Sequence, residues 1–149
     1  MAVLTLRFQS KLLGFSTAVR ILIPTEWGKE FDYKAYYENK EKLPVLWLLH
    51  GGSDNYADWH DCTTVQILAD KYKIAVIMPD AQNGSYSNMA FGPAWFDYMT
   101  QELPEYLYQR FPFSREREKN FIAGMSMGGF GALKIALRYP ERFLAACPI

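Results

Sequence analysis

The chain has 149 residues, of which 50% are hydrophobic and 16% aromatic, enough to bury a single-domain core without a disulfide framework or a structural metal. Its 16 basic residues balance its 16 acidic residues with no basic run or acidic tail, which argues against nucleic acid and anionic membranes as partners. Cys62 and Cys147 lack the spacing of a zinc site and are expected to be reduced thiols in the interior. With no basic leader and no apolar run of membrane-spanning length, the sequence predicts a soluble, cytoplasmic protein with one domain over residues 1–149.

Two segments of strand composition open the chain. Residues 3–8 and 17–23 lie on either side of Gly14, which predicts an antiparallel pair. The polar, aromatic-rich segment 24–42 is expected to be a loop or a short excursion. Residues 45–49 and 74–78 are short, continuously apolar runs, as expected for strands buried on both faces of a parallel sheet. Between these two runs, residues 59–72 have helical spacing.

The second half of the chain continues this alternation. Residues 94–111 have helical spacing, although Pro104 should kink the helix or mark a restart. Trp95, Tyr98 and Tyr106 recur at helical spacing within it and are expected in the core. Residues 120–123 then predict a strand, 127–139 a helix and 143–147 a last strand. Strands that alternate with helices predict a three-layer α/β fold with a mostly parallel sheet and an antiparallel N-terminal pair.

The strongest chemical signal is the pattern G-x-S-x-G around Ser126, placed between a predicted strand and a predicted helix. A serine exposed on so sharp a turn needs glycine two residues before and two residues after it, and Gly124 and Gly128 occupy these positions. The helix that follows directs the partial positive charge of its N-terminus toward a developing oxyanion, and the N–H of Met127 is the expected donor. The pattern therefore predicts that Ser126 is a catalytic nucleophile.

A second signal ends the apolar strand 45–49, where the chain continues as His50-Gly51-Gly52-Ser53. Glycines at the end of a strand let the backbone come close to a reacting carbonyl group. We expect this loop to supply the second oxyanion donor, with the N–H of Gly52 as the first candidate and that of Ser53 as the second. Ser53 is also a candidate for the substrate pocket.

Other polar residues near these motifs have less specific roles. His50 is expected to brace the oxyanion loop by hydrogen bonds, with a role as general base as the alternative. His60 is expected at the surface or at the rim of a pocket, and Asp80 as a turn or capping carboxylate. Asn83 and Tyr86 lie in a polar loop after the strand 74–78, at the sheet edge where ligands usually bind in α/β folds, and they are possible pocket residues.

Motif by motif, the chain resembles the esterase D and S-formylglutathione hydrolase-like group of serine hydrolases, and particularly its short-chain acyl or tributyrin esterases. The resemblance rests on four segments, namely Val45 to Gly52, Ile77 to Asp80 with its Asn-Gly-Ser-Tyr loop, Glu102-Leu103-Pro104, and Phe121 to Leu133. It implies an α/β-hydrolase fold, a Ser-His-Asp triad, a two-donor oxyanion hole and hydrolysis of carboxylic esters or thioesters without a metal or an organic cofactor. A small-molecule ester is the implied partner.

The chain departs from this group after the serine, where the fold places the triad acid and then the histidine. Only Glu141 follows Ser126 as an acidic residue, and no histidine follows it. We therefore expect the N-terminal part of such an esterase, truncated after the strand that follows the nucleophile helix, with impaired activity. A sheet that ends there exposes an edge and an apolar face, which favours a homo-oligomer or a complementing chain. The alternative is a non-catalytic binding or interaction module.

Overall fold

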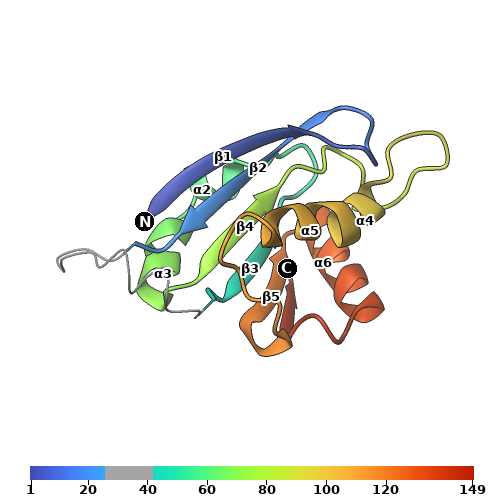
Figure 1. Cartoon of the computed structure of the whole chain (residues 1–149). Coiled ribbons are helices and arrows are strands. Elements are labelled where there is room, and N and C mark those ends of the chain that lie inside the picture. The colour runs from blue at the N-terminus through green and yellow to red at the C-terminus, as the bar shows by residue number, and fades with distance from the viewer. Residues whose placement is uncertain (26–41) are drawn as a thin grey trace.

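The computed structural model describes residues 1–25 and 42–149, and a six-stranded mixed sheet in the order β1-β2-β4-β3-β5-β6 forms its centre (Figure 1). β1 (Ala2–Gln9) and β2 (Ser16–Ile23) are antiparallel, and β2 is also antiparallel to β4 (Ala75–Pro79). The sheet continues through β3 (Val45–Leu49), β5 (Asn120–Gly124) and β6 (Ala145–Pro148), which are parallel to β4 and to one another. The predicted antiparallel pair and parallel core are confirmed.

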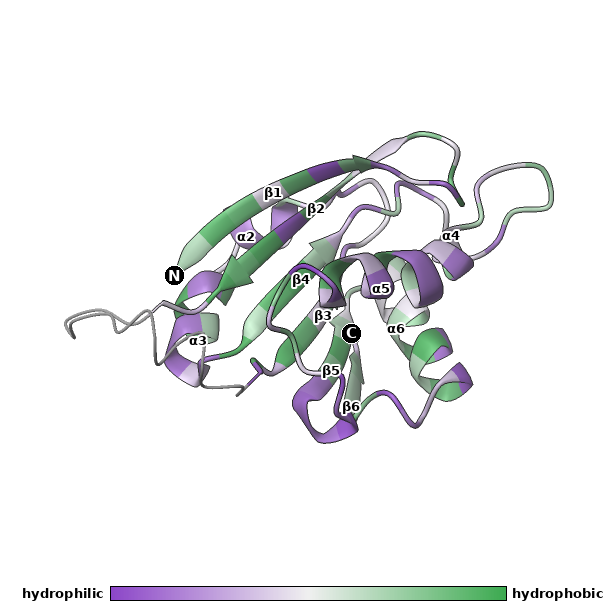
Figure 2. Ribbon diagram, viewed as in Figure 1, coloured by the Kyte–Doolittle hydropathy of each residue, from purple (hydrophilic) through white to green (hydrophobic). Residues whose placement is uncertain are grey.

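Helices cover both faces of the sheet and make three layers. α2 (Asp58–Asp61) and α3 (Val65–Tyr72) lie on one face, and α4 (Trp95–Asp97), α5 (Leu103–Tyr108) and α6 (Met127–Arg138) lie on the other. Successive side chains of β3 alternate between the two faces, so that Trp47 and Leu49 pack with the residues of α5 and α6, and Leu48 packs with Ala69 of α3. Figure 2 shows this pattern as hydrophobic colour along the central strands and hydrophilic colour on α3 and α5.

The helical stretch predicted over 94–111 is present over residues 95–108, and the type of helix changes just before Pro104. A π-helical turn, Tyr98–Glu102, joins α4 to α5, and Pro104 is the second residue of α5. In an α-helix the N–H of residue 104 would bond to the carbonyl of Thr100, but proline has no N–H. Arg142, from the loop before β6, donates a hydrogen bond from Nη1 to the Thr100 carbonyl at 2.6 Å. A distant guanidinium thus supplies the donor that the proline lacks.

Some sequence-based expectations are corrected. The helix predicted over 59–72 is divided into α2 and α3, because the Thr63 hydroxyl donates to the Trp59 carbonyl and accepts from the Val65 N–H at 3.2 Å. Cys62 and Cys147 are exposed rather than interior, since Cys62 lies in this turn and Cys147 in the outermost strand. The last strand begins at residue 145, two residues later than predicted. Most of the segment predicted as a loop over 24–42 lies outside the described residues.

β6 forms one edge of the sheet, and all four of its residues are exposed. Beside it, α6 presents Leu133 and Leu137, with 44% and 73% of their surface exposed. The edge and apolar surface expected from the sequence are therefore present. Among the described residues, no helix has both the length and the apolar character that crossing a membrane requires.

A short 3-10 turn, η2 (Arg117–Lys119), leads into β5 and therefore lies at the opposite end of that strand from Ser126. Asn120, the first residue of β5, fixes this end of the strand. Its side-chain amide donates to the carbonyls of Ser114 and Glu116, each at 2.8 Å, and its Oδ1 accepts from the Tyr108 hydroxyl at 3.2 Å. The loop before β5 is thus held against α5.

Candidate active site

Ser126 lies in the sharp turn that connects β5 to α6 and is exposed. Its backbone has φ 54° and ψ −114°, a conformation that is strained for any residue with a side chain. Hydrogen bonds hold it there, because its N–H donates to the Ile149 carbonyl at 2.7 Å and its own carbonyl accepts from the Phe130 N–H at 2.9 Å. The turn expected around this serine is therefore present.

Two glycines permit this turn by close contact. A Cβ on Gly124 would lie 2.4 Å from the carbonyl group of Gly128, and a Cβ on Gly128 would lie 2.3 Å from the Leu49 carbonyl oxygen. Real Cβ atoms do not approach backbone atoms this closely. The first turn of α6 is therefore pressed against the carboxyl ends of β5 and β3, and any side chain at either position would force them apart.

The loop that follows β3 lies beside this turn. A Cβ on Gly51 would be 3.3 Å from the Met125 side chain, which places the loop against the residue before Ser126. Ser53 has a positive φ of 67°, and its N–H donates to Asn83 Oδ1 at 2.8 Å. Within residues 1–25 and 42–149, the N–H groups of Gly52 and Met127 have no hydrogen-bond acceptor. The Ser53 N–H is thus occupied, whereas those of Gly52 and Met127 are available.

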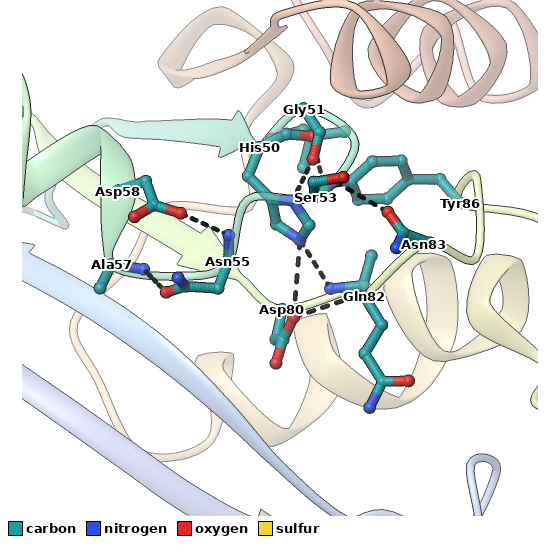
Figure 3. A network of polar contacts seen from close by, with 12 residues as sticks. His50, Gly51, Ser53, Asn55, Ala57, Asp58, Asp80, Gln82, Asn83 and Tyr86 are labelled. Atoms are coloured by element: carbon teal, nitrogen blue, oxygen red, sulfur yellow. Dashed lines mark hydrogen bonds and ion pairs between the residues drawn. The ribbon is translucent and has the colours of Figure 1, made fainter.

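His50 joins the ends of β3 and β4 (Figure 3). Its Nδ1 lies 2.7 Å from the Gly51 carbonyl, so Nδ1 must carry the proton and donate. Its Nε2 accepts from the Ala81 N–H at 3.0 Å, and the fixed direction of that N–H shows that Nε2 holds a lone pair. Both ring nitrogens of a buried, neutral histidine are therefore in use. The predicted bracing interaction is present, and the alternative role as a general base is not supported.

Asp80 adds to this junction. Its Oδ1 accepts from the Gln82 N–H at 3.0 Å, which is the turn-forming role expected from the sequence, and lies 3.5 Å from Nε2 of His50. Burial alone would raise the pKa of this carboxyl group. Hydrogen bonds from the N–H groups of Gln82 and Ala81 stabilise the carboxylate and outweigh burial, so the pKa of Asp80 lies below its usual value and the group is ionised at neutral pH.

Tyr86 supports the same loop from the side of α6. Its hydroxyl donates to the His50 carbonyl at 3.0 Å, and its ring packs so closely on Gly131 that a Cβ there would lie 2.5 Å from it. The side chain is 0% exposed, and burial keeps the pKa of its hydroxyl far above its usual value, so it remains a donor. Tyr86 is therefore part of the buried support and does not line an open pocket. Its partners are 36 and 45 residues away, and no local sequence signal identifies them.

We expect Tyr86→Phe to lower the free energy of unfolding by about 1–2 kcal/mol. The ring still fills its space, but the buried His50 carbonyl loses its donor. Urea unfolding followed by tryptophan fluorescence measures the change. Tyr72→Phe is a matched control, because Tyr72 is 68% exposed, and its variant should unfold like the unmodified protein. Equal stability of both variants would show that the hydroxyl of Tyr86 contributes nothing.

His60 lies apart from the Ser126 turn in a cluster of its own on α2. Its Nε2 lies 2.8 Å from Gln66 Oε1, and its Nδ1 lies 2.7 Å from Asp61 Oδ1 and 2.9 Å from Arg20 Nη1. Neither histidine of the chain hydrogen-bonds to Ser126 within the part of the chain that the structure describes. The same described residues contain no group of three or more histidine, cysteine, aspartate or glutamate side chains that could hold a metal ion.

A family model described as "Putative esterase" matches residues 10–148. The chain belongs to this esterase family. Among its relatives in the family, an acetyl esterase of Caldicellulosiruptor saccharolyticus is 34% identical to it over 146 residues. That alignment covers 97% of the chain and 54% of the relative.

Solved structures of serine hydrolases share the fold of this esterase-family chain. FphF of Staphylococcus aureus, described as a fluorophosphonate-binding serine hydrolase, matches with a TM-score of 0.87 at 33% identity, over 99% of this chain and 56% of its own. S-formylglutathione hydrolase (FrmB) of the same organism matches with a TM-score of 0.81 at 33% identity, over 95% and 54%. The α/β-hydrolase fold is confirmed, and the chain spans about half the length of these esterase-family proteins.

Proposed function

We propose that this chain carries the nucleophile of a serine carboxylesterase that hydrolyses short-chain acyl esters or thioesters through an acyl-enzyme on Ser126. The observation that carries the proposal is the turn at Ser126, with φ 54° and ψ −114°, which presents an exposed serine at the N-terminus of α6. The available N–H groups of Met127 and Gly52 are suitable oxyanion donors. Membership of the esterase family supports the reaction type.

In the proposed reaction, Ser126 Oγ forms a bond to the ester carbonyl carbon while a general base takes the hydroxyl proton. The carbonyl oxygen becomes an oxyanion, which accepts hydrogen bonds from the N–H groups of Gly52 and Met127. Collapse of this intermediate breaks the bond to the alcohol or thiol, which leaves with the proton. Water then attacks the acyl-enzyme in the same manner and releases the carboxylic acid, so that Ser126 regains its proton.

Neither histidine of the described residues is placed to act as the general base for Ser126. His50 uses both ring nitrogens within the loop junction, and His60 is engaged with Gln66, Asp61 and Arg20. An oxyanion hole and substrate binding alone can retain about 10³- to 10⁴-fold of acceleration over water when a triad is disabled. We therefore expect slow acylation of Ser126 and weak ester turnover by this 149-residue chain.

The test is intact-mass spectrometry after exposure to a fluorophosphonate, alongside turnover of 4-nitrophenyl acetate. We expect one adduct per chain, formed slowly, and its complete loss in Ser126→Ala. Ser16→Ala is the matched control, because Ser16 lies at the start of β2 and its variant should form the adduct at the unchanged rate. An adduct that persists in Ser126→Ala would overturn the proposal.

A non-catalytic binding module is the second candidate, and it is favoured because neither His50 nor His60 hydrogen-bonds to Ser126 in the part of the chain that the structure describes. Neither adduct nor turnover in a sample with a cooperative unfolding transition would reject acylation of Ser126 and favour this candidate. Saturable binding of the unhydrolysed nitrophenyl ester would then identify the ligand class.

A further inference from the structure

A cavity of about 370 Å³ lies between α5 and α6, against β3 and β5. Arg115 and Arg142 line it, and they precede β5 and β6 in the chain, so the cavity reaches the amino ends of the parallel strands. Ser126 follows the carboxyl end of β5, at the opposite edge of the sheet. The cavity is therefore separate from the candidate active site. Its volume falls within the range of small-ligand sites, about 300–1,000 Å³.

The inner wall of the cavity is apolar and partly aromatic. Trp47 and Ile122 contribute from β3 and β5 and are 3% and 2% exposed, and Ile135 contributes from α6 at 3%. Tyr108 and Phe143 add aromatic rings. Aromatic and branched aliphatic side chains of this kind suit the faces of a flat, apolar ligand.

The two arginines differ in the charge that they present. Arg115 is neutralised by Glu105, with Nη1 to Oε2 at 3.0 Å and Nη2 to Oε1 at 3.1 Å. Arg142 uses Nη1 for the Thr100 carbonyl, and its Nε lies 3.8 Å from the exposed carboxylate of Glu141. Across residues 1–25 and 42–149, Arg142 Nη2 has no hydrogen-bond acceptor. One incompletely paired positive charge thus faces the cavity.

Arg142 is also held in place. Its Nη1 is fixed on the Thr100 carbonyl of the π-helical turn, the position where Pro104 supplies no N–H. Its guanidinium lies 4.0 Å from the ring centroid of Tyr139. A guanidinium that is anchored before a ligand arrives loses less conformational entropy when it binds an anion. π-Helical turns are also frequent at functional sites.

We propose that this cavity binds a small aromatic monocarboxylate, with its ring against Tyr108 and Phe143, over the buried Trp47, and its carboxylate on Arg142. Because only one guanidinium is incompletely paired, the cavity favours a ligand with a single negative charge. Its apolar wall favours a ligand whose uncharged part is a flat hydrocarbon ring. Binding requires no covalent step. It is independent of Ser126 and of the proposed esterase activity, so either proposal can fail without the other.

The test is a titration of the ¹⁵N-labelled chain with benzoate, followed by NMR at the indole N–H of Trp47. Trp47→Phe assigns that signal, and the signals of Trp59 and Trp95, which do not line the cavity, are internal references. We expect a saturable shift of the Trp47 signal and none of the Trp59 and Trp95 signals. Benzamide has the same shape without the charge and should bind about tenfold more weakly, as the loss of a charge-assisted hydrogen bond predicts.

Arg142→Gln should weaken benzoate binding about tenfold and leave benzamide binding unchanged, because glutamine is polar but carries no charge. Arg138→Gln removes the same charge from the exposed end of α6 and should leave both affinities unchanged. The proposal is overturned if benzoate gives no saturable shift at Trp47, or if benzamide binds equally well. The comparison of the two ligands uses the unmodified chain and remains decisive if Arg142→Gln does not fold.

Discussion

Gly128→Ala should lower the free energy of unfolding by about 3 kcal/mol or more, or prevent folding. The new Cβ would lie 2.3 Å from the Leu49 carbonyl oxygen and 2.6 Å from that of His50. Both are backbone atoms at the end of β3, which is paired on one side with β4 and on the other with β5, so they can move only if the sheet also moves. Overpacking against backbone belongs to the most destabilising class of substitutions.

Gly52→Ala is the matched control for this measurement. A Cβ at position 52 has only Asn83 Oδ1 within 4 Å, at 3.9 Å. The free energy of unfolding of this variant should therefore be unchanged within about 0.5 kcal/mol or slightly raised. Guanidinium unfolding monitored by circular dichroism and by tryptophan fluorescence gives both values. If the two alanine variants unfold at the same denaturant concentration, the close approach of α6 to β3 does not limit stability.

His50→Ala should cost about 3 kcal/mol of stability and also slow the reaction of Ser126 with a fluorophosphonate. The substitution leaves the Gly51 carbonyl and the Ala81 N–H without their partners in a buried region, and it opens a cavity. The loop that carries Gly52 then loses its anchor on β4. Because Gly52 is one of the two proposed oxyanion donors, labelling should slow even under conditions where the variant is fully folded.

His60→Ala is the control for this prediction, because it also removes a histidine but not the junction that positions Gly52. His60 is partly exposed and contacts side chains of the α2 and α3 region rather than the Ser126 turn, so we expect a cost of about 1 kcal/mol and an unchanged labelling rate. Labelling is measured by intact mass in buffer without denaturant, where both variants are folded. An unchanged rate in His50→Ala would contradict the role of this junction in positioning Gly52.

Patterns that are local in sequence predicted most of the fold. The apolar runs 45–49, 74–78 and 120–123 and the helix 127–139 correspond to β3, β4, β5 and α6 with errors of at most one residue at each end. The turn at Ser126 was equally predictable, since the need for glycine on both sides follows from backbone sterics alone. The division between α2 and α3 was not, because it depends on one threonine hydroxyl that replaces backbone hydrogen bonds.

The support around the site depends on contacts between distant segments. The bracing role of His50 was expected, but its partner Ala81 is 31 residues away, and Tyr86 reaches the His50 carbonyl across 36 residues. Asn83 is a possible pocket residue by its place in the sequence, and its side chain accepts from the Ser53 N–H, a contact that the sequence does not indicate. Polar side chains in a loop present the same composition whether they face a ligand or hold another loop, so composition alone cannot separate the two roles.

The contact between Gly128 and the end of β3 also has a kinetic consequence. Local opening requires a segment with few buried contacts, yet the Ser126 turn rests on β3 and β5, which pair with each other inside the sheet. The geometry of this turn should therefore persist until the sheet itself opens, and amides in β3 and β5 should exchange with solvent only through global unfolding. If Ser126 reacts as proposed, the labelling rate relative to that of the fully folded protein would report the fraction of chains that is folded.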